Sequence, residues 1–230
     1  MRWPVNRLDI HALYNRFELP IMDVDCGQMC APHNPNSKPF CCDICHAIPV
    51  AYQEEWEFLQ SRTELWHVWR GDECACEPVD PADLRSETPG HLALLACKGP
   101  AYCERPNRTI ACRQFPFFPY IDSNDLFLGL TYYWDFEPTC WVISNLGLVS
   151  AAYRKVFVRV FDEILARRGE ELDSYAGSSE EMRETFQAKR RRIPLLHRNG
   201  GTYLISPASE AMRRVDPAVL RKFGPYRAAA

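Results

Sequence analysis

Cysteine side chains are the residues in this sequence best suited to chemistry. The chain has eleven cysteines in 230 residues. Nine of them form two groups and a late single residue: Cys26, Cys30, Cys41, Cys42 and Cys45, then Cys97, Cys103 and Cys112, then Cys140. Thiolate sulfur is a soft ligand that suits zinc, iron–sulfur clusters and copper(I). The short spacings therefore predict metal binding by these nine residues.

A disulfide scaffold is the competing interpretation of so many cysteines. Such scaffolds are typical of small secreted chains with an even number of cysteines. Here the number is odd, and residues 1–20 lack the unbroken apolar stretch of a signal peptide. We therefore favour metal thiolates and expect a cytoplasmic location, where thiols are kept reduced.

The number of metal centres stays open at this point. A zinc site or a four-iron cluster takes about four thiolates, and the first group alone holds five. Cys41 and Cys42 are adjacent, so their side chains diverge and one of them is expected to serve another site or none. One centre and two centres are both compatible with this pattern.

Four further residues near the two groups have roles that the sequence leaves open. Cys74 and Cys76 lie in a proline-rich acidic loop, and we interpret them as accessory thiols. His33 and His46 lie within and just after the first group. Each is either a nitrogen ligand or, as we favour, a loop residue that hydrogen-bonds to a thiolate or to water.

The second cysteine group carries a recognisable motif. Cys103 is followed by Arg105-Pro106, and then by Cys112-Arg113-x-Phe115-Pro116-Phe117. This order resembles the YkgJ-type cysteine-cluster family, a family of zinc- or iron-chelating domains, and the resemblance covers about residues 26–140. It implies metal ligation by Cys26, Cys30, Cys42, Cys45, Cys97, Cys103, Cys112 and the late Cys140. The first group departs from the family, because here the double cysteine follows Cys30 after a long gap.

Two arginines are expected to support the thiolates. A cluster of thiolates is strongly anionic, and guanidinium groups offset that charge and donate hydrogen bonds to sulfur. Arg105 and Arg113, next to the cysteines of the second group, are the candidates for this role around the metal ligands.

Three functions are compatible with these residues. The first, which we favour, is a metal-binding protein that holds zinc or an iron–sulfur cluster through clustered thiolates. The second is an iron–sulfur-dependent redox or protein-modifying enzyme, because the flagellin lysine-N-methylases resemble the same family. The third is a structural-zinc module that binds a protein partner. We identify no catalytic residue in the sequence.

Charge and hydropathy argue against two classes of partner. The formal net charge is -3 and the isoelectric point about 6.1, so no overall attraction to nucleic acid is expected. The longest apolar stretch, 141–152, is too short to cross a membrane. The expected partners are a metal ion or cluster and a protein, but neither nucleic acid nor a membrane.

The elements that must position these cysteines are predicted as an α+β fold, mostly α-helical, with irregular cysteine-rich metal loops and a small C-terminal β-hairpin. Apolar residues at helical spacing predict helices over 8–18, 50–69 and 148–168, and capping serines followed by acidic residues predict a helix over 178–191. Two apolar segments around an Asn-Gly pair predict the hairpin over 193–205. We expect a cysteine-cluster domain over 1–145 and a helical extension over 146–230 packed on it.

Overall fold

The structure is a computed structural model that describes residues 7–74 and 81–227. The chain divides into two compact units. The large-sheet unit comprises Met1–Arg7, Leu19–Cys26 and Pro116–Ala230, and the small-sheet unit comprises Leu8–Glu18 and Gly27–Phe115. These units divide the chain at other residues than the domains expected from the sequence, which stay a prediction.

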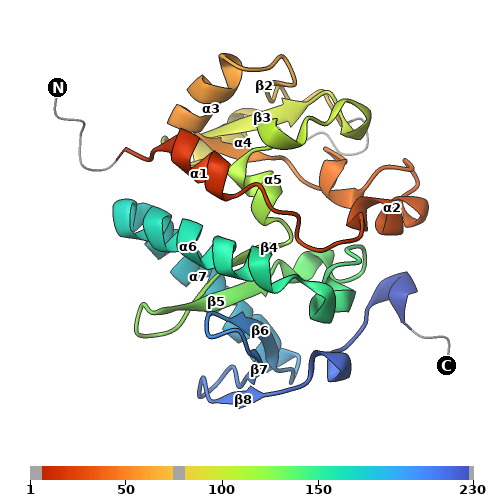
Figure 1. The fold of residues 1–230 in the computed structure, drawn as a ribbon, viewed down its shortest axis with the longest axis vertical. Coiled ribbons are helices and arrows are strands. Elements are labelled where there is room, and N and C mark those ends of the chain that lie inside the picture. The colour runs from red at the N-terminus through yellow and green to blue at the C-terminus, as the bar shows by residue number, and fades with distance from the viewer. Residues whose placement is uncertain (1–6, 75–80, 228–230) are drawn as a thin grey trace. The chain divides into compact units, whose positions relative to one another are not determined.

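The large-sheet unit contains a five-stranded antiparallel sheet (Figure 1). Its strands, in spatial order, are β4 (Phe117–Ile121), β5 (Phe127–Tyr132), β6 (Ile193–His197), β7 (Thr202–Ile205) and β8 (Met212–Arg214). The β6–β7 connection is tight because Gly200 adopts a positive φ of 90°, which glycine tolerates without steric cost. The predicted hairpin therefore exists, and β5 and β8 extend it on both sides.

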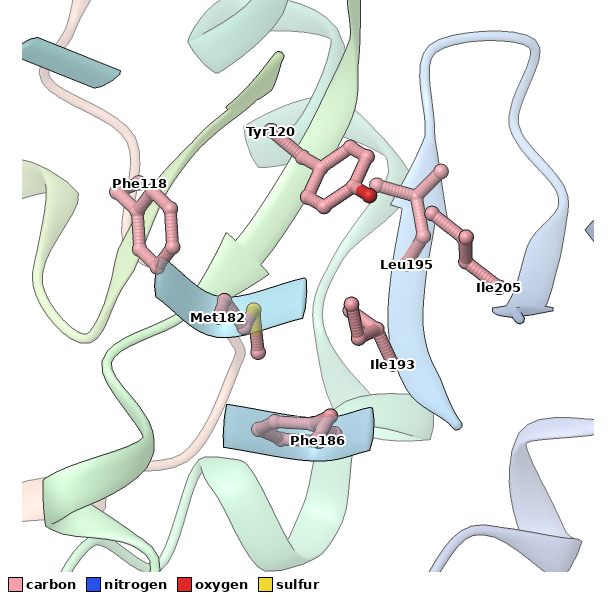
Figure 2. Close-up of a cluster of buried hydrophobic side chains, with 7 residues drawn as sticks. All are labelled: Phe118, Tyr120, Met182, Phe186, Ile193, Leu195 and Ile205. Atoms are coloured by element: carbon pink, nitrogen blue, oxygen red, sulfur yellow. The ribbon is translucent and has the colours of Figure 1, made fainter. Parts of the chain in front are cut away.

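Two long helices pack against strands β4 and β5 of this unit. They are α6 (Ala151–Arg167) and α7 (Gly169–Ala188), and the Ser150 side chain caps α6 by accepting from the Tyr153 amide. Successive strand residues face opposite sides, so Phe117 contacts Tyr153 of α6 while Phe118 packs with α7. Figure 2 shows the second contact, with Met182 between Phe118 and Ile193.

The small-sheet unit is built around a three-stranded antiparallel sheet. Strand β3 (Leu92–Cys97) lies between β1 (Val50–Tyr52) and β2 (Trp66–Val68). The helices of this unit are α1 (Ile10–Arg16), α3 (Gln53–Gln60), α4 (Pro81–Glu87) and α5 (Ile110–Gln114), while α2 (Cys26–Cys30) begins at the last residue of the large-sheet unit. Leu95 at the centre of β3 is fully buried, so this strand organises the core of the unit.

The expected fold class was wrong. The described residues form two antiparallel sheets, so the chain is not mostly helical and its sheet is not a small hairpin. The helix predicted over 50–69 is also wrong at both ends. Only Gln53–Gln60 is helical there, because Val50–Tyr52 and Trp66–Val68 pair with β3 on either side. Burial against a neighbouring strand thus overrides the helical spacing of the local aromatic residues.

The amphipathic helices predicted over 8–18 and 148–168 are confirmed. The first is α1, and the second is α6, whose buried face holds Phe157, Val160 and Ile164. Helix α7 begins at Gly169, nine residues before the predicted start at 178. Over the described ranges, no helix has both the length and the apolar character needed to cross a membrane.

Candidate metal centre

The second cysteine group lies where three short elements of the small-sheet unit end or begin. Cys97 is the last residue of β3, and Cys103 follows a 3-10 turn, Pro100–Tyr102. Cys112 lies in the first turn of α5, where the Thr109 side chain caps the helix by accepting from the Cys112 amide at 3.1 Å. The backbone of each thiol is thus held by regular structure or by a cap.

Four thiols of this unit influence one another's charge. Burial first, and then the nearby Cys42 and Cys97, raise the pKa of Cys112 to about 12. The pKa of Cys97 is also raised, first by burial and then by Cys42 and Cys103. Cys42 of the first group thus lies within electrostatic range of Cys97 and Cys112 of the second group.

Arg108 is the cation of this thiol cluster, which we define as Cys42, Cys97, Cys103 and Cys112. Its Nε donates to Cys103 Sγ at 3.0 Å. Burial opposes the charge on Arg108, but the bond to Cys103 and the negative charges that Cys103, Cys42 and Cys112 carry when ionised outweigh it and raise the pKa of Arg108. The sequence analysis missed this residue, although its position five residues after Cys103 places it inside the second group.

The two arginines expected around the thiolates occupy different environments. Arg113 is buried, and its guanidinium donates to the backbone carbonyls of Tyr14, Phe17, Pro106 and Arg108 at 2.6–3.2 Å. It therefore ties α1 to the segment that carries the thiol cluster. Arg105 is exposed in a 3-10 turn, Arg105–Asn107.

A buried carboxylate fixes the start of α5. Glu55 is 1% exposed, and it accepts hydrogen bonds from the Tyr14 hydroxyl at 2.7 Å and from the Ile110 amide at 2.6 Å. Burial raises its pKa from 4.5 to about 7, although these donors and Arg113 act in the opposite direction. Glu55 thereby anchors the turn that leads into Cys112.

The first cysteine group is organised by the buried Asp43. Its carboxylate accepts from the side-chain amides of Asn34 and Asn36 at 3.0 and 2.8 Å, and from the Cys45 amide at 3.3 Å. Although burial acts in the opposite direction, these donors hold the Asp43 pKa below its usual value. Cys42 ends the preceding 3-10 turn, Phe40–Cys42, so Asp43 fixes the chain between Cys42 and Cys45.

Cys45 forms a disulfide with Cys74. The loop before Cys74 is held by the Glu73 carboxylate, which accepts from the Arg70 and Gly71 amides at 2.9 and 2.8 Å. The expectation that Cys45 ligates metal and that Cys74 is an accessory thiol thus meets a structure in which the two are covalently joined. Cys76 lies outside the described residues.

The remaining candidate ligands are spread over both units. Cys30, in the small-sheet unit, is buried and its thiol donates to the Gly27 carbonyl, while Cys41 is half-buried. Cys26 and Cys140 belong to the large-sheet unit, where Cys140 is 8% exposed. His33 is exposed, and the exposed His46 lies edge-on to the Phe40 ring.

An open pocket of about 570 Å³ borders the second cysteine group. It is lined by residues 60–65 together with Lys98, Tyr102 and Glu104. Lys98 directly follows Cys97, and Tyr102 and Glu104 flank Cys103 on either side. Glu104 accepts from the Thr63 hydroxyl at 2.7 Å, which links the two walls of the pocket.

The donor set of the thiol cluster suits zinc or an iron–sulfur cluster, because both take four thiolates. Within residues 7–74 and 81–227, however, no group of three or more Cys, His, Asp or Glu side chains stands in an arrangement that could hold a metal ion. The four thiols are therefore near enough to affect one another's pKa, but they are not gathered at ligating distances.

Comparisons of the chain with protein-family models, with curated proteins and with solved structures find no match.

Proposed function

We propose that this chain is a metal-binding protein that holds zinc or an iron–sulfur cluster through Cys42, Cys97, Cys103 and Cys112. The observation that carries the proposal is that three of these four thiols, from separate segments, interact with one guanidinium, that of Arg108. Arg108 donates to Cys103 and interacts with the charges of Cys42 and Cys112. Four thiolates with a hydrogen-bonding cation are the surroundings that a thiolate-bound metal needs.

The raised pKa values of Cys97 and Cys112 support the same proposal. Without a metal, neutral thiols are favoured there because burial and mutual repulsion both oppose ionisation. A bound cation would displace the thiol protons and remove that repulsion, so binding would release protons to solvent. Binding would also require the four side chains to rotate toward a common point, since no three donors of the described chain are gathered now.

A cytoplasmic location stays a prediction from the sequence, and the Cys45–Cys74 disulfide does not support it because thiols are kept reduced in that compartment. The metal-binding proposal narrows the nine cysteines suggested by the sequence to four in the small-sheet unit. Cys45 cannot serve as a thiolate ligand while its sulfur is bonded to Cys74. A protein partner, and the absence of nucleic-acid and membrane partners, stay predictions from composition.

Metal analysis of variants tests the proposal. We expect anaerobically isolated full-length protein to contain zinc, or iron with acid-labile sulfide, and Cys103→Ser to lose most of it. Cys41→Ser is the matched control, because Cys41 neighbours Cys42 but lies outside the thiol cluster. Equal metal content in the wild type and in Cys103→Ser would overturn the assignment of the ligands, and metal-free wild type would overturn the function.

A further inference from the structure

Cationic side chains are concentrated in the last part of the large-sheet unit, from the end of α7 onward. Residues 189–227 contain ten lysines and arginines but only two acids, Glu210 and Asp216. The whole chain, in contrast, has a formal net charge of -3. This unit therefore carries a strongly basic stretch that the overall charge conceals.

The buried Phe223 joins two parts of this stretch. Phe223 is 5% exposed, and the guanidinium carbons of Arg191 and Arg221 lie 5.2 and 5.4 Å from the centroid of its ring. Arg191 also forms a bidentate ion pair with Glu137, at 2.6 and 2.8 Å. Arg191 is therefore part of the fold, and the shared ring places the segment around Arg221 beside the end of α7.

The other cations around this ring have no acidic partner. The nearby Glu137 carboxylate is already paired with Arg191. Five residues, which we call the basic patch, are exposed and form no ion pair or side-chain hydrogen bond within residues 7–74 and 81–227: Lys189, Arg190, Arg192, Arg221 and Lys222. Like charges held close together repel one another, so an anion that covered the patch would relieve this repulsion.

Arg190 has a backbone conformation that disfavours its own residue type. Its φ is 51°, in the left-handed region, and α7 ends there with the Arg191 amide donating to the Phe186 carbonyl at 2.8 Å. Glycine is the usual residue at such a helix end, because a Cβ atom costs free energy in this conformation. Stability alone therefore favours glycine over arginine at position 190.

Glu210 shows how a long side chain can offset the same conformation. Its φ is 52°, but its carboxylate accepts from the Ser123 amide at 3.2 Å and pairs with Arg183 at 3.1 Å. The Arg190 side chain has no such contact in the described part of the chain. An arginine at position 190 is therefore explained by a contact outside the chain rather than by the fold.

We propose that the basic patch binds an acidic segment of a partner protein. Aspartate and glutamate carboxylates accept charge-assisted, often bidentate, hydrogen bonds from guanidinium groups, and most cations of the patch are arginines. The patch consists of two short segments, so a short acidic segment covers it. A nucleic acid or an anionic membrane would extend over the rest of a chain that is acidic overall.

Titration of a fluorescein-labelled octa-glutamate peptide tests the proposal. Full-length protein is added to the peptide at about 20 mM and about 200 mM salt, and fluorescence anisotropy reports binding. We expect binding at low salt that weakens by about tenfold or more at high salt, because exposed ion pairs are screened. The triple variant Lys189→Gln, Arg190→Gln and Arg192→Gln should lose about tenfold or more of the low-salt affinity.

Arg190→Gly separates binding from folding. Glycine relieves the left-handed backbone, so the urea midpoint of this variant should equal or exceed that of the wild type. Loss of the cation should weaken peptide binding by about twofold to fivefold. Arg159→Gln, at an exposed arginine of α6, is the matched control and should bind the peptide as the wild type does.

Several outcomes would overturn the proposal. One is wild type that does not bind octa-glutamate at low salt, and another is an equal loss of affinity in Arg159→Gln and Arg190→Gly. Tighter binding of oligo-dT or of phosphatidylserine vesicles than of the peptide, lost in the triple variant, would assign the patch to that class of partner instead. A lowered urea midpoint in Arg190→Gly would show that Arg190 serves the fold. If the triple variant does not fold, Arg190→Gly decides the result.

Discussion

In the large-sheet unit, buried aromatic and aliphatic side chains face one another across a continuous core, as Phe118, Met182 and Phe186 do. The small-sheet unit has apolar contacts around Leu95 as well, but its cysteine-bearing loops depend on carboxylates. Asp43, Glu55 and Glu73 each collect hydrogen bonds from segments that carry or precede a cysteine. One unit is therefore held mainly by packing, while the candidate site in the other is held by polar anchors that respond to pH and to loss of single hydrogen bonds.

The largest effect is expected from truncating a side chain in the packed core of the large-sheet unit. Phe186 is completely buried, and Phe186→Ala is expected to lower the free energy of unfolding by about 3–5 kcal/mol because it removes apolar contacts and leaves a cavity. Met212→Ala, at a side chain that is 43% exposed, is the control and should change it by about 0.5 kcal/mol or less. Urea denaturation followed by circular dichroism measures both, and similar midpoints for the two variants would contradict the packing account.

The small-sheet unit should instead show a pH dependence that comes from Glu55. The folded protein holds the Glu55 proton more tightly than the unfolded chain, because burial raises the pKa to about 7. Protonated Glu55 therefore contributes on the order of 2–3 kcal/mol to the free energy of unfolding. This contribution is fully present below about pH 4.5 and is lost as the pH rises through 7. Glu55→Gln should remove that slope in urea denaturation series between pH 4.5 and 8. An unchanged slope in the variant would show that another group titrates.

A smaller effect is expected from the anchor of the first cysteine group. Asp43→Ala removes the acceptor of the Cys45 amide and one of the two acceptors of the buried Asn34 side-chain amide, which should cost about 1–3 kcal/mol of unfolding free energy. Asp72→Ala is the control, because the Asp72 side chain is 81% exposed. Parallel urea titrations compare the two variants. An equal loss of unfolding free energy in both would contradict the role of Asp43 as an anchor of the first cysteine group.

The mildest change concerns the cation of the thiol cluster. Arg108→Gln is expected to weaken zinc binding by about 10–100-fold, because the variant loses the charge-assisted bond to Cys103. Arg105→Gln, at an exposed arginine three residues earlier, should bind zinc as the wild type does. Competition with a chromophoric chelator gives both affinities. The reverse order would restore Arg105 to the role that the sequence suggested.

Local patterns in the sequence predicted some elements and misled on others. Helix α6 was predictable because its apolar residues recur on one face, and the β6–β7 hairpin because Gly200 permits the turn. The five-stranded sheet was not, because β5 pairs with β6 across more than sixty residues. Pairing between distant segments also explains why the helix predicted over 50–69 was wrong at both ends. Those ends are strands β1 and β2, which pair with β3 more than twenty-five residues away in the sequence.

In the candidate site, too, local sequence spacing predicted some features, while others depend on how distant segments fold together. The cysteine groups were visible from spacing alone, and Cys97, Cys103 and Cys112 do lie near one another's charges. Spacing could not show that Cys42 joins them, that Cys45 pairs with Cys74 across 29 residues, or that Arg108 rather than Arg105 donates to Cys103. Each of these facts depends on how separate segments fold together.

Residue-resolved protection of thiols by zinc tests the central claim most directly. Metal-free protein is alkylated with and without added zinc, and each cysteine is followed by peptide mass spectrometry. We predict that zinc slows alkylation of Cys42, Cys97, Cys103 and Cys112 together, while Cys41 reacts at the same rate in both conditions. Protection of none of the four, or equal protection of Cys41, would contradict the thiol cluster as the metal-binding site.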